Sequence, residues 1–197
     1  MWMRSPGRCA ALLTAVLLTG CGGSPAPGPS ASPAPPPCTP DTGTIAWDAP
    51  ASTPTLLQVV ARFLNDDLTT WRDLVDRPIT PEVTGDGTDR TWIPTLARSL
   101  GEHLNLSLGA ASSPDSELES LRTMLEGSTQ KGWVLGYSGT SVVKAGFRVT
   151  CGGGSTPVAG TLTTWNSIDA GFLSCDDTAA RDQPSDYGEV WTYCPTD

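Results

Sequence analysis

The chain has 197 residues, with 12 lysines and arginines against 21 aspartates and glutamates, so its formal net charge is −9 at pH 7. Such an acidic chain is a poor partner for nucleic acid, because nucleic-acid binding depends on basic side chains that neutralise phosphates. The same charge disfavours adsorption to anionic lipid headgroups, and the sequence has no basic cluster that would offset it.

Residues 1–20 have the layout of an export signal. Arg4 and Arg8 make the start positive, and an apolar run follows from Cys9 to Leu18. A permanent membrane helix needs about 20 apolar residues. The shorter run therefore predicts a signal peptide, and because no second such run follows we expect no spanning helix in the mature chain.

The signal ends at Leu18-Thr19-Gly20-Cys21, an aliphatic residue and two small residues before a cysteine. This ending resembles the lipobox of bacterial lipoproteins, and the resemblance covers residues 1–21. It implies cleavage after Gly20, a lipid on Cys21, and a position on the outer side of the cell membrane, held by acyl chains. The alternative is an ordinary secretory signal with a chance cysteine. The scarcity of lysine and the richness in alanine, glycine and proline indicate a GC-rich genome, such as that of an actinobacterium. The domain resembles the small lipoproteins of actinobacteria.

The segment after Cys21 is a linker rich in proline, alanine, glycine and serine up to residue 37. It has little to bury and cannot offset the entropy of ordering. Its prolines favour an extended chain with a reach on the order of 50 Å. We expect residues 21–37 to hold one extracytoplasmic domain, residues 38–197, away from the membrane; about 160 residues suit a single domain.

The first part of the domain predicts strands. Thr44–Trp47 is a short β-like run, and Leu68–Val75 is read as a strand. Leu56–Leu64 fits both a helical and a strand period, and we favour the strand slightly. Gly85-Asp86-Gly87 is a turn.

Two helices follow. Apolar residues from Ile93 to Leu104 form one stripe at helical spacing, with Pro94 suited to the first turn. The second helix has Ser113 as its expected N-cap and Pro114 at the next position, and it stops at Gly127. Its stripe consists of Leu118, Leu121 and Leu125.

The remainder predicts an antiparallel C-terminal meander. The expected strands are Trp133–Tyr137, Ser141–Cys151, Thr161–Trp165, Gly171–Cys175 and Glu189–Cys194. Ser138-Gly139-Thr140, the triple glycine after Cys151 and residues 166–170 are read as its turns. Helices in one block and strands in another predict an α+β fold, a mostly antiparallel sheet with two helices packed on it.

Cys38, Cys151, Cys175 and Cys194 lie in the domain, and an exported chain meets an oxidising compartment, so two disulfides are expected. In the meander, Cys151 and Cys175 end at the same sheet edge, which predicts the pairs Cys151–Cys175 and Cys38–Cys194. The competing pattern is Cys38–Cys151 with Cys175–Cys194. We expect no zinc or other metal site, because there is no Cys-x-x-Cys and only one histidine.

The sequence offers weak catalytic candidates. His103, the single histidine, has no nucleophile motif beside it and suits the end of a helix. Ser141 and Lys144 match the Ser-x-x-Lys of penicillin-binding enzymes, but in a strand these two positions face opposite sides. Gly136–Thr140 is a near miss for a nucleophile elbow and is better read as a hairpin turn.

Two further groups of residues, a possible calcium loop and the tryptophans, are better explained by a structural role than by ligand binding. Thr84, Asp86 and Asp89 do not have the spacing of a calcium loop. The tryptophans of the domain suit core packing, although Trp165 and Trp191 could line a groove for sugar or peptide.

The leading hypothesis is a non-enzymatic, monomeric binding domain of the cell envelope that needs no cofactor. Its partners would be the membrane, through the lipid on Cys21, and an envelope protein or glycan. The alternative is a small hydrolase acting on cell-wall glycan or peptide. A transporter's solute-binding component is disfavoured, because about 160 residues is small for two lobes and a hinge.

Overall fold

The computed structural model describes residues 37–66, 68–113, 117–181 and 186–195. These residues belong to one compact unit, whereas the predicted signal peptide, Cys21 and the predicted linker up to residue 36 lie outside the described residues. Within the described ranges, no helix combines the length and the apolar character needed to cross a membrane.

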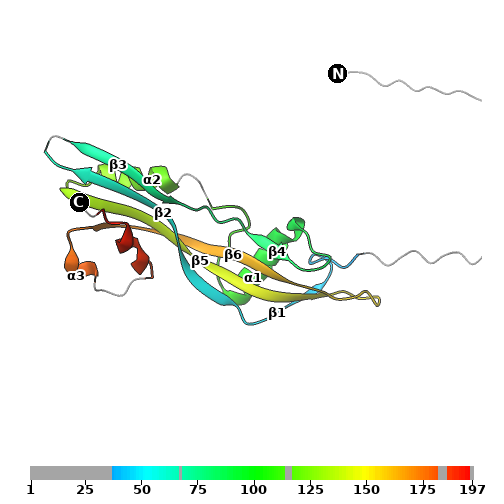
Figure 1. Ribbon diagram of the computed structural model, residues 1–197. Helices are drawn as coiled ribbons and strands as arrows, with labels where there is room; N and C mark the ends of the chain where they lie inside the picture. Colours follow the sequence, from blue (N-terminus) through cyan, green and yellow to red (C-terminus); the bar gives the residue numbers. More distant parts are fainter. Residues whose placement is uncertain (1–36, 67, 114–116, 182–185, 196–197) are drawn as a thin grey trace, which may run out of the picture. The chain divides into compact units, whose positions relative to one another are not determined.

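A curled antiparallel sheet is the main element of the described part of the chain (Figure 1). Its strand order is β3-β2-β5-β6-β4, and β1 pairs with β5 beyond the end of β2. Over the described ranges the fold is therefore mixed helix and strand, with a predominantly antiparallel sheet, few helices and two disulfides. The strands are β1 (Thr44–Trp47), β2 (Ala51–Leu64), β3 (Thr69–Asp76), β4 (Glu82–Thr84), β5 (Gly132–Thr150) and β6 (Val158–Ser174).

The two longer helices lie where their apolar stripes predicted them. Helix α1 (Ile93–Leu104) buries Leu96 and Leu100 against odd-numbered residues of β5 such as Phe147. Helix α2 (Glu117–Glu126) buries Leu121 and Leu125 against Val60 and Val134. Because neighbouring residues of a strand face opposite ways, α1 and α2 lie on opposite faces of β5. Shorter helical turns are η1 (Arg90–Trp92), α3 (Thr178–Arg181) and η2 (Gly188–Tyr193).

The start of the second helix differs from the expectation in part. Pro114 lies outside the described residues. Ser113 is buried and exchanges two hydrogen bonds with Ile79: the Ser113 amide donates to the Ile79 carbonyl at 2.8 Å, and the Ile79 amide donates to Ser113 Oγ at 3.0 Å. These bonds fix the loop that leads toward α2.

The predicted meander is wrong in its detail, because two expected turns lie inside continuous strands. β5 runs through Ser138-Gly139-Thr140 and β6 runs through residues 166–170. A β-bulge takes up the polar run in β6: Asn166 and Ser167 together oppose Ser141, and Thr140 Oγ1 donates to both their carbonyls at 3.3 and 2.9 Å. The predicted strand Glu189–Cys194 is the 3₁₀ helix η2 instead.

The glycines of β5 serve packing. A Cβ on Gly139 would collide with the ring of Tyr187, and one on Gly136 would lie 3.2 Å from Leu125 of α2. The two glycines therefore let partners approach opposite faces of the strand. The sequence Gly136–Thr140 is neither an elbow nor a turn.

The predicted disulfide pairing is also wrong. The bonds join Cys38 to Cys151 and Cys175 to Cys194, with Cα atoms 5.6 and 5.5 Å apart. β5 and β6 form one long hairpin, so Cys151 lies at its turn and Cys175 at its far end. The 17 residues of β6 span on the order of 55 Å, which no disulfide can bridge.

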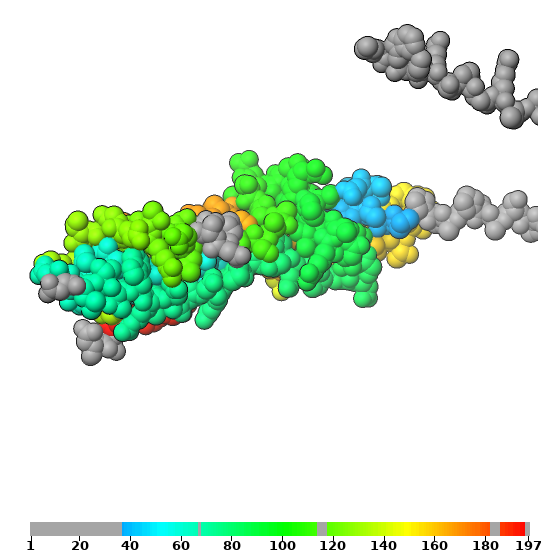
Figure 2. Space-filling view, turned by 90° about the horizontal axis from the view of Figure 1, so that it is seen from above, coloured from blue at the N-terminus to red at the C-terminus, as the bar shows by residue number. Residues whose placement is uncertain are grey.

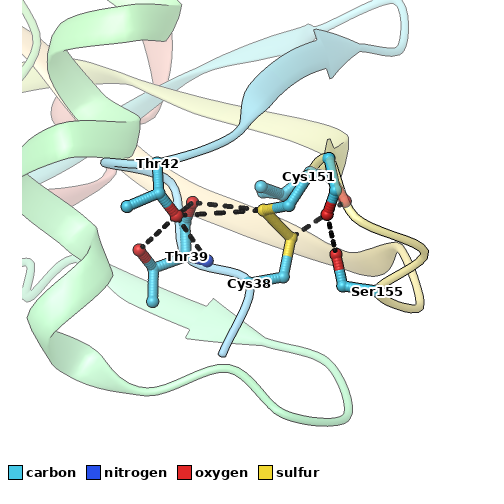
Figure 3. The surroundings of a disulfide bond; sticks show 7 residues. Cys38, Thr39, Thr42, Cys151 and Ser155 are labelled. Atoms are coloured by element: carbon cyan, nitrogen blue, oxygen red, sulfur yellow. Dashed lines mark hydrogen bonds between the residues drawn. A yellow bond between two sulfur atoms is a disulfide. The ribbon is translucent and has the colours of Figure 1, made fainter. Parts of the chain in front are cut away.

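The first bond lies where the described chain begins (Figure 3). The amides of Thr42 and Gly43 donate to the Thr39 carbonyl at 3.1 and 3.0 Å, forming a turn just after Cys38. Thr42 Oγ1 lies 3.9 Å from the Cys151 sulfur. The disulfide thus fastens the entry of the chain to the tip of the β5–β6 hairpin.

Candidate functional site

Exposed apolar side chains meet at a hollow between α2 and β6. Met124 of α2 is 40% exposed and Phe172 of β6 is 59% exposed. Both line a hollow of about 420 Å³, here called the α2–β6 hollow. Its other lining residues are Leu125, Gly127, Ser128, Thr129 and Gln130.

The position of α2 across the sheet leaves Phe172 uncovered. Phe172 pairs with Gly136, so its side chain is on the sheet face that carries α2. Leu125 fills the space above Gly136 on β5, and β6 is the next strand out. Figure 2 shows atoms of β6, in orange, at the surface between α2 in yellow-green and the green region that contains α1.

A buried arginine fixes the end of α2 that forms the hollow. Arg62 of β2 is 3% exposed. Its guanidinium donates to the Leu125 carbonyl and, at 3.2 Å, to the Gln130 carbonyl. Carbonyls at a helix C-terminus have no partner within the helix, so Arg62 supplies the donors that hold residues 125–130 in place.

In the described part of the chain, the outer edge of β6 has no strand beside it next to the hollow, and it is called the open edge below. β4 pairs only with Thr161–Thr163, and the Gly109 amide donates to the Trp165 carbonyl at 2.7 Å. Beyond Trp165, none of the described strands pairs with this edge. The Cys175 amide donates inward to the Trp133 carbonyl at 2.9 Å. Because the backbone bonds of an antiparallel strand alternate, the amides and carbonyls of Ile168, Ala170, Phe172 and Ser174 point outward.

The surroundings of this edge are acidic. Asp169, Glu126, Asp176 and Asp177 are exposed. Among the described residues, the ion pairs of Arg122 and Lys131 involve other carboxylates, those of Asp73, Glu119 and Asp66. Arg181 lies over the ring of Trp191 at 5.5 Å. The pKa of Tyr187 is raised above its ordinary value, first by burial and then by Asp169 and Asp186, so the negative field reaches the opposite sheet face as well.

A second hollow, of about 540 Å³, lies between α1 and the loop that follows it. Its charged lining residues are Arg98 and Glu102, and Leu106 on its rim is 43% exposed. His103 is exposed in the last turn of α1, where the helix dipole favours it, and it does not line this hollow.

The other sequence candidates are not brought together. Ser141 and Lys144 are both in β5 and face opposite sides, as expected for a strand. Asp89 accepts a hydrogen bond from the Thr91 amide at 2.7 Å and caps η1. Among the described residues, no three histidine, cysteine or acidic side chains are grouped so that they could hold a metal ion.

The tryptophans are used in packing. Trp92 is buried in the core beside α1, and Trp133 packs against Phe63 with Arg72 over its ring. The Trp165 indole donates to the Ala111 carbonyl at 2.9 Å, and Trp191 lies under Arg181. Neither hollow has a tryptophan in its lining.

No family model, curated protein or solved structure matches this chain. Its candidate site therefore stands on the geometry of its own residues. Sequence reasoning missed Phe172 and Met124, because each is an ordinary apolar residue within a predicted strand or helix. The signal that could have found Met124 is its position outside the stripe of Leu118, Leu121 and Leu125.

Proposed function

We propose that this chain is a lipid-anchored extracytoplasmic protein whose domain binds a partner protein of the cell envelope, without catalysing a reaction. The observation that carries the proposal is the α2–β6 hollow, where Phe172 and Met124 are exposed beside an open sheet edge. Single exposed apolar residues are common, but large ones gathered at one place mark interaction surfaces. The lipobox supports the location.

The lining of the hollows favours binding over hydrolysis. A glycan hydrolase of the usual kind needs two carboxylates that face each other across a cleft. The α1 hollow has one lining carboxylate, Glu102, and the α2–β6 hollow has none among its lining residues. The latter offers a phenylalanine, a methionine and backbone groups, which suit an apolar protein side chain better than a sugar.

Site-specific crosslinking in living cells tests the binding function. A photo-reactive amino acid replaces Phe172 in one full-length variant and Met124 in a second. A third carries it at Thr156, which is exposed in the β5–β6 turn and serves as the control. We expect positions 172 and 124 to give the same discrete crosslinked protein, and position 156 not to give it. The same products from all three positions, or none from 172 and 124, would contradict the proposal.

Fatty-acid labelling tests the anchor. Cys21→Ala removes the sulfur that would carry the lipid. We therefore expect it to abolish incorporation of labelled fatty acid and to leave uncut or released protein. Cys9→Ala, within the apolar run of the signal, is the matched control and should keep the label. Full labelling of the Cys21→Ala variant would show that the chain is not anchored in this way.

A further inference from the structure

We infer that the partner contributes an extended segment that pairs with the outer edge of β6 along Ile168–Ser174 as an additional strand. This segment carries an apolar side chain for the α2–β6 hollow and lysine or arginine near its ends. The inference rests on the proposed function and specifies the chemistry of its partner.

The backbone of β6 offers the hydrogen bonds. Ile168, Ala170, Phe172 and Ser174 present outward amides and carbonyls, and none of the described strands pairs with this edge. An extended peptide that adds to an open edge gains affinity from main-chain bonds and specificity from side chains that enter adjacent pockets. Here the pocket adjoins the edge, because Phe172 belongs to both.

The ends of the open edge are fixed by the structure. On one side, the bulge at Asn166 and Ser167 and the bond from Gly109 to Trp165 interrupt the edge. On the other side, β6 ends at Ser174, before the disulfide of Cys175. The partner strand therefore has a window of about seven residues, which is a usual strand length.

The opposite edge of the sheet shows the protection that β6 lacks. β3 carries Arg72, Asp73 and Asp76, and a bulge at Leu74 shifts its register with β2. Asp73 is held by Arg122 of α2 at 2.7 Å. Charges and bulges are the devices that keep sheet edges from pairing with other chains. Ile168–Ser174 contains one charged residue, Asp169, and no bulge.

Charge selects the partner. Asp169 lies within the open window, Asp176 and Asp177 follow it after Cys175, and Glu126 ends α2. An incoming strand with basic residues near its ends would be attracted to these carboxylates. A second copy of the chain would instead bring two acidic edges together, and its net charge of −9 adds to this repulsion.

A proline at position 170 separates strand addition from other modes of binding. The Ala170 amide points away from β5, so Ala170→Pro removes an outward donor and keeps the inward ladder, which is the arrangement in which an edge strand tolerates proline. Ala170→Thr keeps the donor and is the matched control. In the full-length chain with the crosslinker at position 172, we expect Ala170→Pro to reduce the yield of the crosslinked partner at least tenfold. Ala170→Thr should leave the yield within about twofold of the parent, because it keeps the donor. The tenfold loss is expected for Ala170→Pro because proline removes one main-chain bond to the partner and disturbs the fit of the added strand.

The crosslinked segment of the partner supplies a second measurement that does not depend on the stability of a variant. A synthetic peptide that copies this segment is titrated against the lipidated chain in detergent micelles. We expect N-methylation at alternate residues to weaken binding at least tenfold while the intervening positions tolerate it, and exchange of its terminal lysines or arginines for glutamate to weaken binding as well.

The outcomes of these experiments distinguish a failure of strand addition from a failure of the proposed binding function. Crosslinking at position 172 that persists in Ala170→Pro, or a peptide that tolerates every N-methyl group, overturns strand addition and leaves the proposed function standing. A segment without basic residues overturns the charge selection. Absence of any crosslink at positions 172 and 124 overturns the proposed function and this inference with it.

Discussion

Replacing Cys38 and Cys151 together by serine is expected to lower the free energy of unfolding by about 5 kcal/mol, because this disulfide closes a loop of 113 residues. A cross-link restricts the unfolded chain, and the restriction grows with the length of the closed loop. The Cys175–Cys194 disulfide closes 19 residues, so its double serine variant should lose about 3 kcal/mol. Denaturation in urea under non-reducing conditions measures both losses.

The surroundings of Cys38 and Cys151 should enlarge the difference in stability loss between the two double serine variants. Both cysteines pack against the core cluster that includes α1 and Phe147. β1, which begins a few residues later, has only four paired positions with β5. A larger loss for the Cys175/Cys194 variant, or equal losses, would mean that the long loop is already restricted in the unfolded chain.

Arg62→Met is expected to lower the free energy of unfolding by about 3 kcal/mol, because it removes two charge-assisted hydrogen bonds. The Leu125 carbonyl then keeps only the Ser128 amide, at 3.0 Å. The aliphatic stem is kept, but the Leu125 and Gln130 carbonyls lose the guanidinium that binds them. Arg62 and Leu125 are buried, so water cannot readily replace the bond between them.

Arg72→Met is the matched control for Arg62→Met. Arg72 is exposed on β3 and lies 4.8 Å from the Trp133 ring centroid, so its loss should cost less than about 1 kcal/mol. Hydrogen exchange gives an independent reading: amides of residues 121–126 should exchange faster in Arg62→Met and remain protected in Arg72→Met. Equal stability of the two variants would show that residues 125–130 do not depend on Arg62.

The helices could be predicted because each has one unbroken apolar stripe. Leu96 with Leu100 and Leu121 with Leu125 are buried as the period indicated. β2 follows the slight preference for a strand over Leu56–Leu64, and its long buried run, which is covered on both faces, explains why the helical period also fitted.

The strand boundaries of the hairpin could not be predicted from local composition. Gly139 has the residue type of a turn, but its lack of a side chain makes room for Tyr187, a contact 48 residues away that no local pattern reveals. The polar run after Trp165 forms a bulge because β5 continues beside it. Once these two turns are removed, Cys151 and Cys175 move to opposite ends of the hairpin, and the disulfide pairing changes with them.

The candidate site depends on tertiary placement in the same way. A strand at Gly171–Cys175 was predicted, and Phe172 is in it. Whether its ring is covered depends on how far α2 extends across the sheet, and this is set by Leu125 above Gly136 and by Arg62. Packing was the favoured role of the tryptophans, and the alternative groove at Trp165 and Trp191 is not found, because both have partners in the fold.

The Cys38–Cys151 bond also decides how a mechanical load would travel through the domain. β1 pairs antiparallel with the end of β5, from Thr44 opposite Thr150, so a pull on the chain at residue 38 would otherwise peel these few pairs apart one at a time. The covalent bond passes the pull from Cys38 directly to Cys151, at the junction of the two longest strands. Residues 39–150 are then outside the line of force, and a partner held on β6 would be connected to residue 38 only through the disulfide, the turn after Cys151 and β6 itself.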